Sequence, residues 1–254
     1  AVGSFTRAII MGGIVSVPSY SNVIDYVSFA TTGNAADFGN LTGSPQLPAG
    51  ASNSVRALNA GGADPGNSNV INYFNMASTG DAVDFGDLTV TRHGLAGLAS
   101  PTRACFSGGE SPSQETTIDY VEISTTGNAV DFGDLTDGRR GISGASSSTR
   151  GVFSAGAAPG LVATTEYITI ASQGNAIDYA DLSAATRNGG FTSDSRRAYF
   201  AGGTTPSVTN VIENILINNG GAFVDTGNLT VARGYLAGCS NAHGGLNDGY
   251  QGTR

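Results

Sequence analysis

The sequence has no lysine or tryptophan, and only two cysteines and two histidines among 254 residues. Twelve arginines stand against twenty acidic residues, and the net charge is −8. An acidic, lysine-free chain has no electrostatic footprint for nucleic acid or for an anionic membrane, so neither is expected as a partner. Two cysteines are too few for a disulfide scaffold, and Cys105 and Cys239 are therefore expected to be free.

Long apolar runs are also missing. No stretch approaches the roughly 20 apolar residues of a membrane helix, and no basic and then apolar signal peptide opens the chain. We therefore expect no membrane insertion. The first residue is Ala rather than Met, from which we expect either a processed N-terminus or a segment of a longer polypeptide.

What the sequence has instead is a repeat. The pair Asp131-Phe132 lies in the stretch TTIDYVEISTTGNAVDFGDLTDGRR, and its aspartate recurs every 47 residues, at Asp37, Asp84, Asp178 and Asp225. Self-similarity at a period of 20 to 50 residues indicates a solenoid, a propeller or an array. The chain is therefore expected to form one repeat-built body.

Each unit reads as four short strands, which we call a, b, c and d. In the third unit these strands are expected at 94–100, 102–106, 118–124 and 129–135. The runs are short, rich in Val, Ile, Tyr, Phe and Thr, and separated by Gly, Asn and Pro, which is typical of strands and turns. The fold class is therefore all-β, with four-stranded blades.

The loops differ in how much they repeat. The turn between strands c and d keeps a Thr-Gly-Asn pattern, as at Gly127 and Asn128, which favours a tight hairpin. The loop between strands b and c varies in every unit and always contains a Pro. Variable loops on a constant scaffold lie on the surface, where binding residues tend to occur.

Strand a is made of small residues. Gly50, Gly97, Gly144 and Gly238 occupy one register position, as expected where inner strands converge on a narrow central channel. Phe191 holds the same position in the fifth unit, and its ring is expected to plug part of the channel.

The ends suggest how the ring closes. We expect residues 1–241 to form a five-bladed β-propeller in which a C-terminal strand a, at 234–240, pairs with N-terminal strands b, c and d. Residues 242–254 are polar and Gly-rich, and they are expected to be a tail or linker.

The repeat resembles the Kelch repeat of β-propellers. The resemblance lies in a strand ending in Gly-Gly, a Tyr about eleven residues later, an aromatic residue, and then Leu-Thr before an Arg. These positions are Gly108, Gly109, Tyr120, Phe132, Leu135 and Arg139. The chain departs from the Kelch pattern in having no Trp and in a longer gap between the Tyr and the second aromatic residue.

The segment IDYVEISTTGNAVDFGDLT is also similar to Kelch-like arrays in structural and tail-fibre proteins of marine or cyanobacterial tailed phages. That similarity implies a non-enzymatic structural or adhesion module of a virion. Its partners would be other virion proteins or a host surface glycan or protein, with the chain acting within a longer polypeptide or as a homo-oligomer. The alternative is a secreted bacterial propeller that binds glycans in the manner of a lectin, or binds proteins.

The residues present do not favour a catalytic function. Glycoside hydrolases need paired carboxylates around the funnel, whereas the inner strands offer only Asp194. His93 and His243 are too few for a copper site of the galactose oxidase type, and neither lies in a serine-triad motif. No enzyme activity, no cofactor and no metal are expected, although Asp64, Asn67 and Asn69 leave calcium open as an alternative to a solvated turn.

The repeated acids look structural. Asp131 and Asp134 lie three residues apart on a strand and so point to opposite faces. We expect acids of this kind to pair with the repeated arginines at 7, 56, 103, 150 and 197.

The arginines between strands d and a are the candidate binding residues. Guanidinium groups on the loop face could hold an acidic glycan or a partner's carboxylates, because they bind such groups bidentately. The alternative is that each arginine caps carbonyls of a neighbouring blade. The candidates are Arg92, Arg139, Arg140, Arg187 and Arg233.

Overall fold

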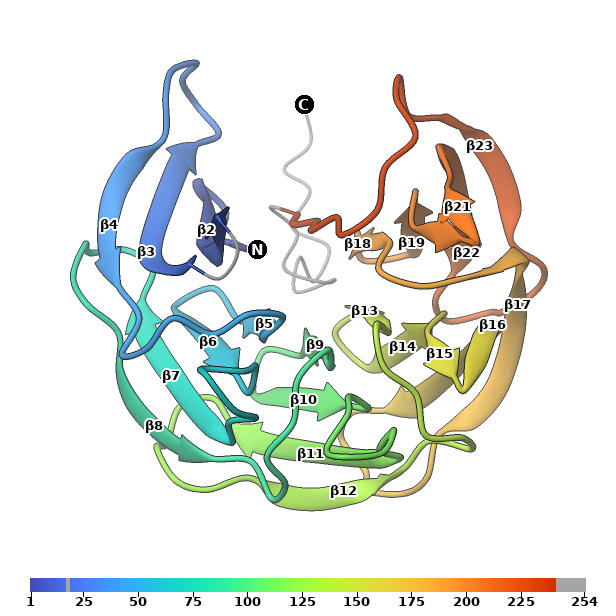
Figure 1. Ribbon diagram of the computed structural model, residues 1–254, viewed down its shortest axis with the longest axis horizontal. Helices are drawn as coiled ribbons and strands as arrows, with labels where there is room; N and C mark the ends of the chain where they lie inside the picture. The colour runs from blue at the N-terminus through green and yellow to red at the C-terminus, as the bar shows by residue number, and fades with distance from the viewer. Residues whose placement is uncertain (17–18, 241–254) are drawn as a thin grey trace.

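A computed structural model describes residues 1–16 and 19–240 of the chain (Figure 1). All regular elements among these residues are β-strands, and no helix is present that could cross a membrane. The strands form five four-stranded antiparallel blades around a central axis. The predicted five-bladed, all-β propeller is therefore confirmed.

The blades follow one another along the chain. Blade 1 contains β1 (Val2–Gly3), β2 (Arg7–Ser16), β3 (Ser19–Ser28) and β4 (Ala36–Asn40). Blade 2 contains β5 (Ala49–Ser52), β6 (Arg56–Ala60), β7 (Val70–Asn75) and β8 (Val83–Asp87). Blade 3 contains β9 (Ala96–Ala99), β10 (Arg103–Ser107), β11 (Thr117–Glu122) and β12 (Val130–Asp134).

The last two blades carry small additions. Blade 4 contains β13 (Ser143–Ser146), β14 (Arg150–Ser154), β16 (Gly160–Thr169) and β17 (Ile177–Thr186), with the short β15 (Ala157–Ala158) paired to β16. Blade 5 contains β18 (Gly190–Ser193), β19 (Arg197–Ala201), β22 (Val211–Leu216) and β23 (Val224–Asn228). A hairpin of β20 (Thr204–Thr205) and β21 (Ser207–Val208) lies in its b-to-c loop.

The hydrophobic core lies between blades rather than within one layer. Each of four buried clusters joins side chains of one blade to side chains of the next. The second aromatic residue of the repeat takes part in this packing, since the Phe38 ring of blade 1 lies 5.0 Å from the Phe74 ring of blade 2. The aromatic residue of the Asp-Phe motif therefore stabilises the contact between successive blades.

The Gly that follows this Phe is required by the same contact. Gly133 has a φ of 146°, and a Cβ on it would lie 2.5 Å from the Gly174 carbonyl oxygen of blade 4. Gly174 in turn donates its amide to the Phe132 carbonyl at 2.9 Å. The Phe-Gly pair and the Thr-Gly-Asn turn are thus two sides of one interface, which explains why they repeat together.

Ring closure differs from the prediction. Blade 1 already has its own inner strand, because Val2 pairs with Ile9 and Gly3 with Ala8. The C-terminal segment 234–240 is not a strand of blade 1, and the expected pairing with the N-terminal strands is wrong. The sequence does carry the signal, because Ser4-Phe-Thr-Arg7 repeats the spacing of Ser100-Pro-Thr-Arg103 and so marks a preceding strand a. The predicted tail at 242–254 lies outside the described residues.

The repeated arginines on strand b do not pair with the Asp of the Asp-Phe motif, so that expectation is also wrong. Arg103 lies 4.7 Å from the centre of the Tyr120 ring and donates to the Ile170 carbonyl of the next blade at 3.2 Å. Its ion-pair partner is Glu122, at 2.7 Å. The Tyr of the repeat therefore provides a platform for an arginine that caps the neighbouring blade.

The two cysteines are free, as expected, and burial controls their chemistry. Burial raises the pKa of the Cys105 thiol from 9.0 to about 12. The folded state therefore holds this proton more tightly than the unfolded state does. Its contribution to stability is complete below pH 9.0 and is lost as the pH rises toward 12.

We expect Cys105 to resist iodoacetamide at pH 8 in the folded protein and to react after denaturation, because only the thiolate attacks. Mass spectrometry of peptides before and after urea treatment measures this. Rapid labelling of Cys105 in the folded protein would contradict its burial.

Candidate functional site

The variable loops meet on one face of the ring. The d-to-a loop of each of the first four blades forms an isolated β-bridge with the b-to-c loop of the next, as between His93 and Glu110 and between Arg187 and Thr204. Arg140 forms the equivalent bridge with Ala157. Both kinds of loop therefore lie on the same face of the ring.

A chain of backbone hydrogen bonds surrounds the channel mouth on this face. It joins a column of five residues at one repeat position: Leu47, Gly94, Gly141, Asn188 and Tyr235. From Gly94 onward, the amide of each donates to the carbonyl of the residue 47 positions earlier, at 2.9 Å from Gly94 and at 2.7 Å from Tyr235. Every residue of the column has a left-handed φ, including Leu47 at 52°, Asn188 at 55° and Tyr235 at 57°. Non-glycine residues seldom adopt this conformation, and such strain concentrates at functional positions.

The column borders a shallow hollow of about 170 Å³. Tyr235 is 67% exposed and Leu47 is 40% exposed, so an aromatic ring and an aliphatic side chain face solvent at the channel mouth. The hollow is lined by Leu47, His93, Gly94, Arg140, Gly141, Arg187, Asn188 and Tyr235. It combines two guanidinium groups, an imidazole and an exposed aromatic ring.

Two of the five candidate arginines lie elsewhere. Arg92 is fully buried between blades 2 and 3, where it donates to Asp119 at 2.8 Å and to the Thr117 carbonyl at 2.7 Å. Arg139 makes the equivalent ion pair with Glu166. Burial lowers the pKa of both guanidinium groups, and the facing carboxylate opposes that effect. These two arginines have the geometry of the structural alternative, in which the side chain caps a neighbouring blade.

The other three candidates are more accessible. Arg140 forms an ion pair with Glu110, and its side chain remains 39% exposed. Arg187 lines the hollow with Arg140, whereas Arg233 is exposed but outside the lining. Whether any of them binds a ligand stays a prediction.

Neighbouring loop residues hold this arrangement in place. The His93 Nδ1 atom lies 2.8 Å from the Asn67 amide oxygen, and Asn67 also donates to the Glu110 carbonyl at 2.9 Å. Asp64 accepts a hydrogen bond from the Ser44 amide at 2.6 Å. Asp64 and Asn67, considered for calcium from the sequence, thus tie the loops of blades 1, 2 and 3 together. Across 1–16 and 19–240, no group of three or more His, Cys, Asp or Glu side chains is placed to hold a metal ion.

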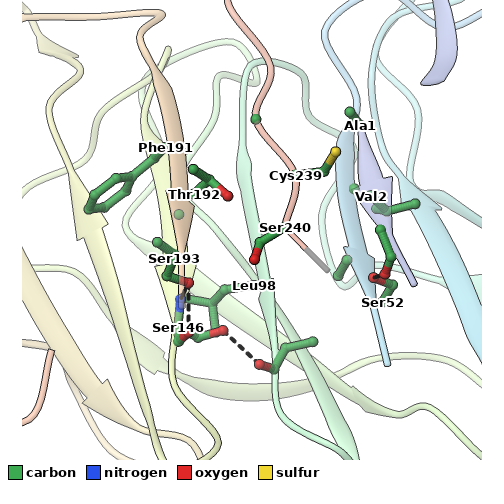
Figure 2. A pocket seen from close by; sticks show the side chains of 18 residues that line it. Ala1, Val2, Ser52, Leu98, Ser146, Phe191, Thr192, Ser193, Cys239 and Ser240 are labelled. Atoms are coloured by element: carbon green, nitrogen blue, oxygen red, sulfur yellow. Dashed lines mark hydrogen bonds between the residues drawn. The ribbon is translucent and has the colours of Figure 1, made fainter. Parts of the chain in front are cut away.

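The central channel itself is narrow, with a volume of about 80 Å³. Its described lining consists mainly of strand-a residues, among them Gly50, Gly97 and Gly144, which confirms that strand a faces the axis. Phe191 does not plug it. Figure 2 shows the Phe191 ring directed away from Cys239 and Ser240, and it packs against Phe200 at a centroid distance of 5.6 Å. The apolar Phe191 ring is more stable when it is buried against blade 5 than when it is exposed in a polar channel.

A scan of protein-family models and a search of curated proteins found no match to this chain. The likeness of the repeat sequence to Kelch repeats therefore remains a resemblance, whereas the propeller fold is shown by the structure.

Proposed function

We propose that this chain is a non-enzymatic binding module that recognises its ligand at the hollow on the loop face. The observation that carries this proposal is the contrast between the two faces. The loop face gathers the variable loops and the side chains of Arg140, Arg187 and Tyr235 at one hollow. The opposite face repeats a turn with a Gly at one position in all five units, followed by Asn or Asp in four of them.

The chemistry of the hollow favours an anionic ligand with a flat apolar surface, such as an acidic glycan. Arg140 and Arg187 can bind a carboxylate through paired N–H groups. The exposed Tyr235 ring offers a stacking platform beside them. A protein partner that presents carboxylates and an apolar side chain has the same chemistry.

The setting we propose is a phage virion, in which the module acts as a structural or adhesion component of a tail fibre or host-recognition appendage. The similarity of the repeat to phage structural arrays supports it, and many copies on one particle would strengthen a weak single contact. A secreted bacterial protein that binds glycans or proteins is the second candidate, supported by the variable loops. Mass spectrometry of purified virions separates the two, since a secreted protein would be absent from particles.

Replacing Arg140 and Arg187 together by Ala is expected to weaken binding on a glycan array at least about tenfold, because each lost charged hydrogen bond contributes about 1.5–3 kcal/mol. The melting temperature should stay within a few degrees, since the ion pair of Arg140 is partly exposed and the Arg187 side chain is only half-buried. Arg233→Ala is the matched control, because Arg233 is exposed on an equivalent loop but outside the hollow. Equal loss in the control, or unchanged binding in the double variant, would place the site elsewhere.

A further inference from the structure

Among the residues that the structure describes, six segments rather than five surround the central channel. The inner strands β1, β5, β9, β13 and β18 supply five of them, and residues 238–240 supply the sixth. A Cβ on Gly238 would lie 3.3 Å from the Phe191 carbonyl oxygen, and one on Gly3 would lie 2.5 Å from that of Ser240. The C-terminal segment therefore stands between blade 5 and blade 1, as Figure 1 shows, in the place of a sixth strand a.

Four interfaces join the five blades, and they share the same contacts. At each one, an arginine at the start of strand b donates to a backbone carbonyl at the end of strand c of the next blade. The side chain of that carbonyl residue is at most 1% exposed. The pairs are Arg7 with Met76, Arg56 with Ile123, Arg103 with Ile170 and Arg150 with Ile217.

Blade 1 has the same contact surface without a neighbour among the described residues. Phe29 occupies the register position of Met76 and Ile123, yet it is 46% exposed. Ile10 occupies the position of Phe106, which is fully buried, yet it is 43% exposed. Both apolar side chains occupy positions that are buried in the other blades, and here they face solvent.

Blade 5 presents the complementary surface. Arg197 holds the position of Arg103, and its guanidinium has no partner among residues 1–16 and 19–240. Arg233 holds the position of Arg92 and Arg139, each of which is buried against a carboxylate of the next blade, yet it is exposed. Blade 5 thus carries the cationic half of an interface whose acidic half is missing from the described part of the chain.

We propose that the sector between blade 5 and blade 1 is a docking site for one further blade of the same repeat. The occupant would be a three-stranded segment of strands b, c and d, because 234–240 already fills the place of strand a. Its strand c would carry an Asp or Glu to pair with Arg233 and a large aliphatic residue at the position of Ile123. Its strand d would carry an aromatic residue and Gly to cover Phe29 as β12 covers the blade that follows it.

The four existing interfaces give the proposal its chemistry. Arg233 would gain a buried carboxylate partner, as Arg92 and Arg139 have in Asp119 and Glu166. The exposed Phe29 and Ile10 side chains would be buried, as their counterparts are in the clusters between blades. Direct closure of blade 5 onto blade 1 is opposed by the C-terminal segment that lies between their inner strands.

The probe is a peptide with the sequence of residues 101–136, which contains strands b, c and d of blade 3 with Asp119 and Ile123. Added to the full chain, it is expected to form a one-to-one complex in native mass spectrometry and to slow hydrogen exchange at 23–29 and 224–233. Arg233→Ala in the protein, or Asp119→Ala in the peptide, should weaken the complex at least about tenfold through the lost charged hydrogen bonds. Arg196→Ala is the matched control, because Arg196 is an exposed arginine of the same blade.

Failure of the peptide to bind, or binding that is the same with Arg233→Ala as with Arg196→Ala, would overturn the proposal. Dimers of the full chain that protect the same two segments without any peptide would also overturn it, because the occupant would then be a second copy. Protection of those segments in the monomer alone would show that the ring closes on itself.

Discussion

Replacing Arg139 by Ala is expected to lower the free energy of unfolding by about 3–5 kcal/mol, because it leaves a buried carboxylate without its partner. Glu166 is fully buried and also accepts hydrogen bonds from Thr136, so water cannot replace the guanidinium. Urea denaturation of the variant and the parent chain measures the difference.

Two controls separate the buried charge from the general loss of an arginine. Arg140→Ala, one residue further along, should cost only about 0–1 kcal/mol, because its ion pair with Glu110 is partly exposed. Removing both partners, with Arg139→Met and Glu166→Leu together, should recover much of the loss, since apolar pairs replace buried ion pairs at little cost. A loss below about 1 kcal/mol in Arg139→Ala would show that water reaches Glu166.

These neighbouring arginines also show where the sequence stops being informative. Arg139 and Arg140 are adjacent in one loop, yet one is buried between blades and the other borders the hollow. The repeat register identifies the position of each, since Arg92 and Arg139 share one column and Arg140 and Arg187 share the next. The register does not identify which of the two sets of side chains is buried between blades, because that depends on the left-handed backbone at Gly141 and Asn188.

The fold was more predictable than the site because each blade repeats one local pattern. The period of 47, the Gly positions of strand a and the turn between strands c and d are sufficient for the blades and the channel. Closure was mispredicted because six copies of strand a accompany only five copies of strands b, c and d. The spacing of Ser4 and Arg7 marks a strand a before blade 1, and the pairing of Val2 with Ile9 shows that this first copy, not the last, belongs to blade 1.

Only a weak signal in the sequence marks the position of the hollow. Leu47 and Tyr235 occupy a column that is Gly at 94 and 141, so a large residue there departs from the repeat. Such departures are visible in the sequence, but their meaning depends on the channel mouth that only the assembled ring creates.

A second large loss of stability is expected at a repeat position whose side chain is buried in one blade and exposed in another. Phe106 is fully buried in the cluster between blades 2 and 3, and Phe106→Ala is expected to cost about 3–5 kcal/mol of stability through lost burial and a residual cavity. Ile10 holds the equivalent place in blade 1 and is 43% exposed, so Ile10→Ala should cost well under half as much. Thermal and urea unfolding of the two variants provide the comparison. Equal losses would mean that a neighbour covers Ile10 in solution, which would locate an occupied sixth place in the ring.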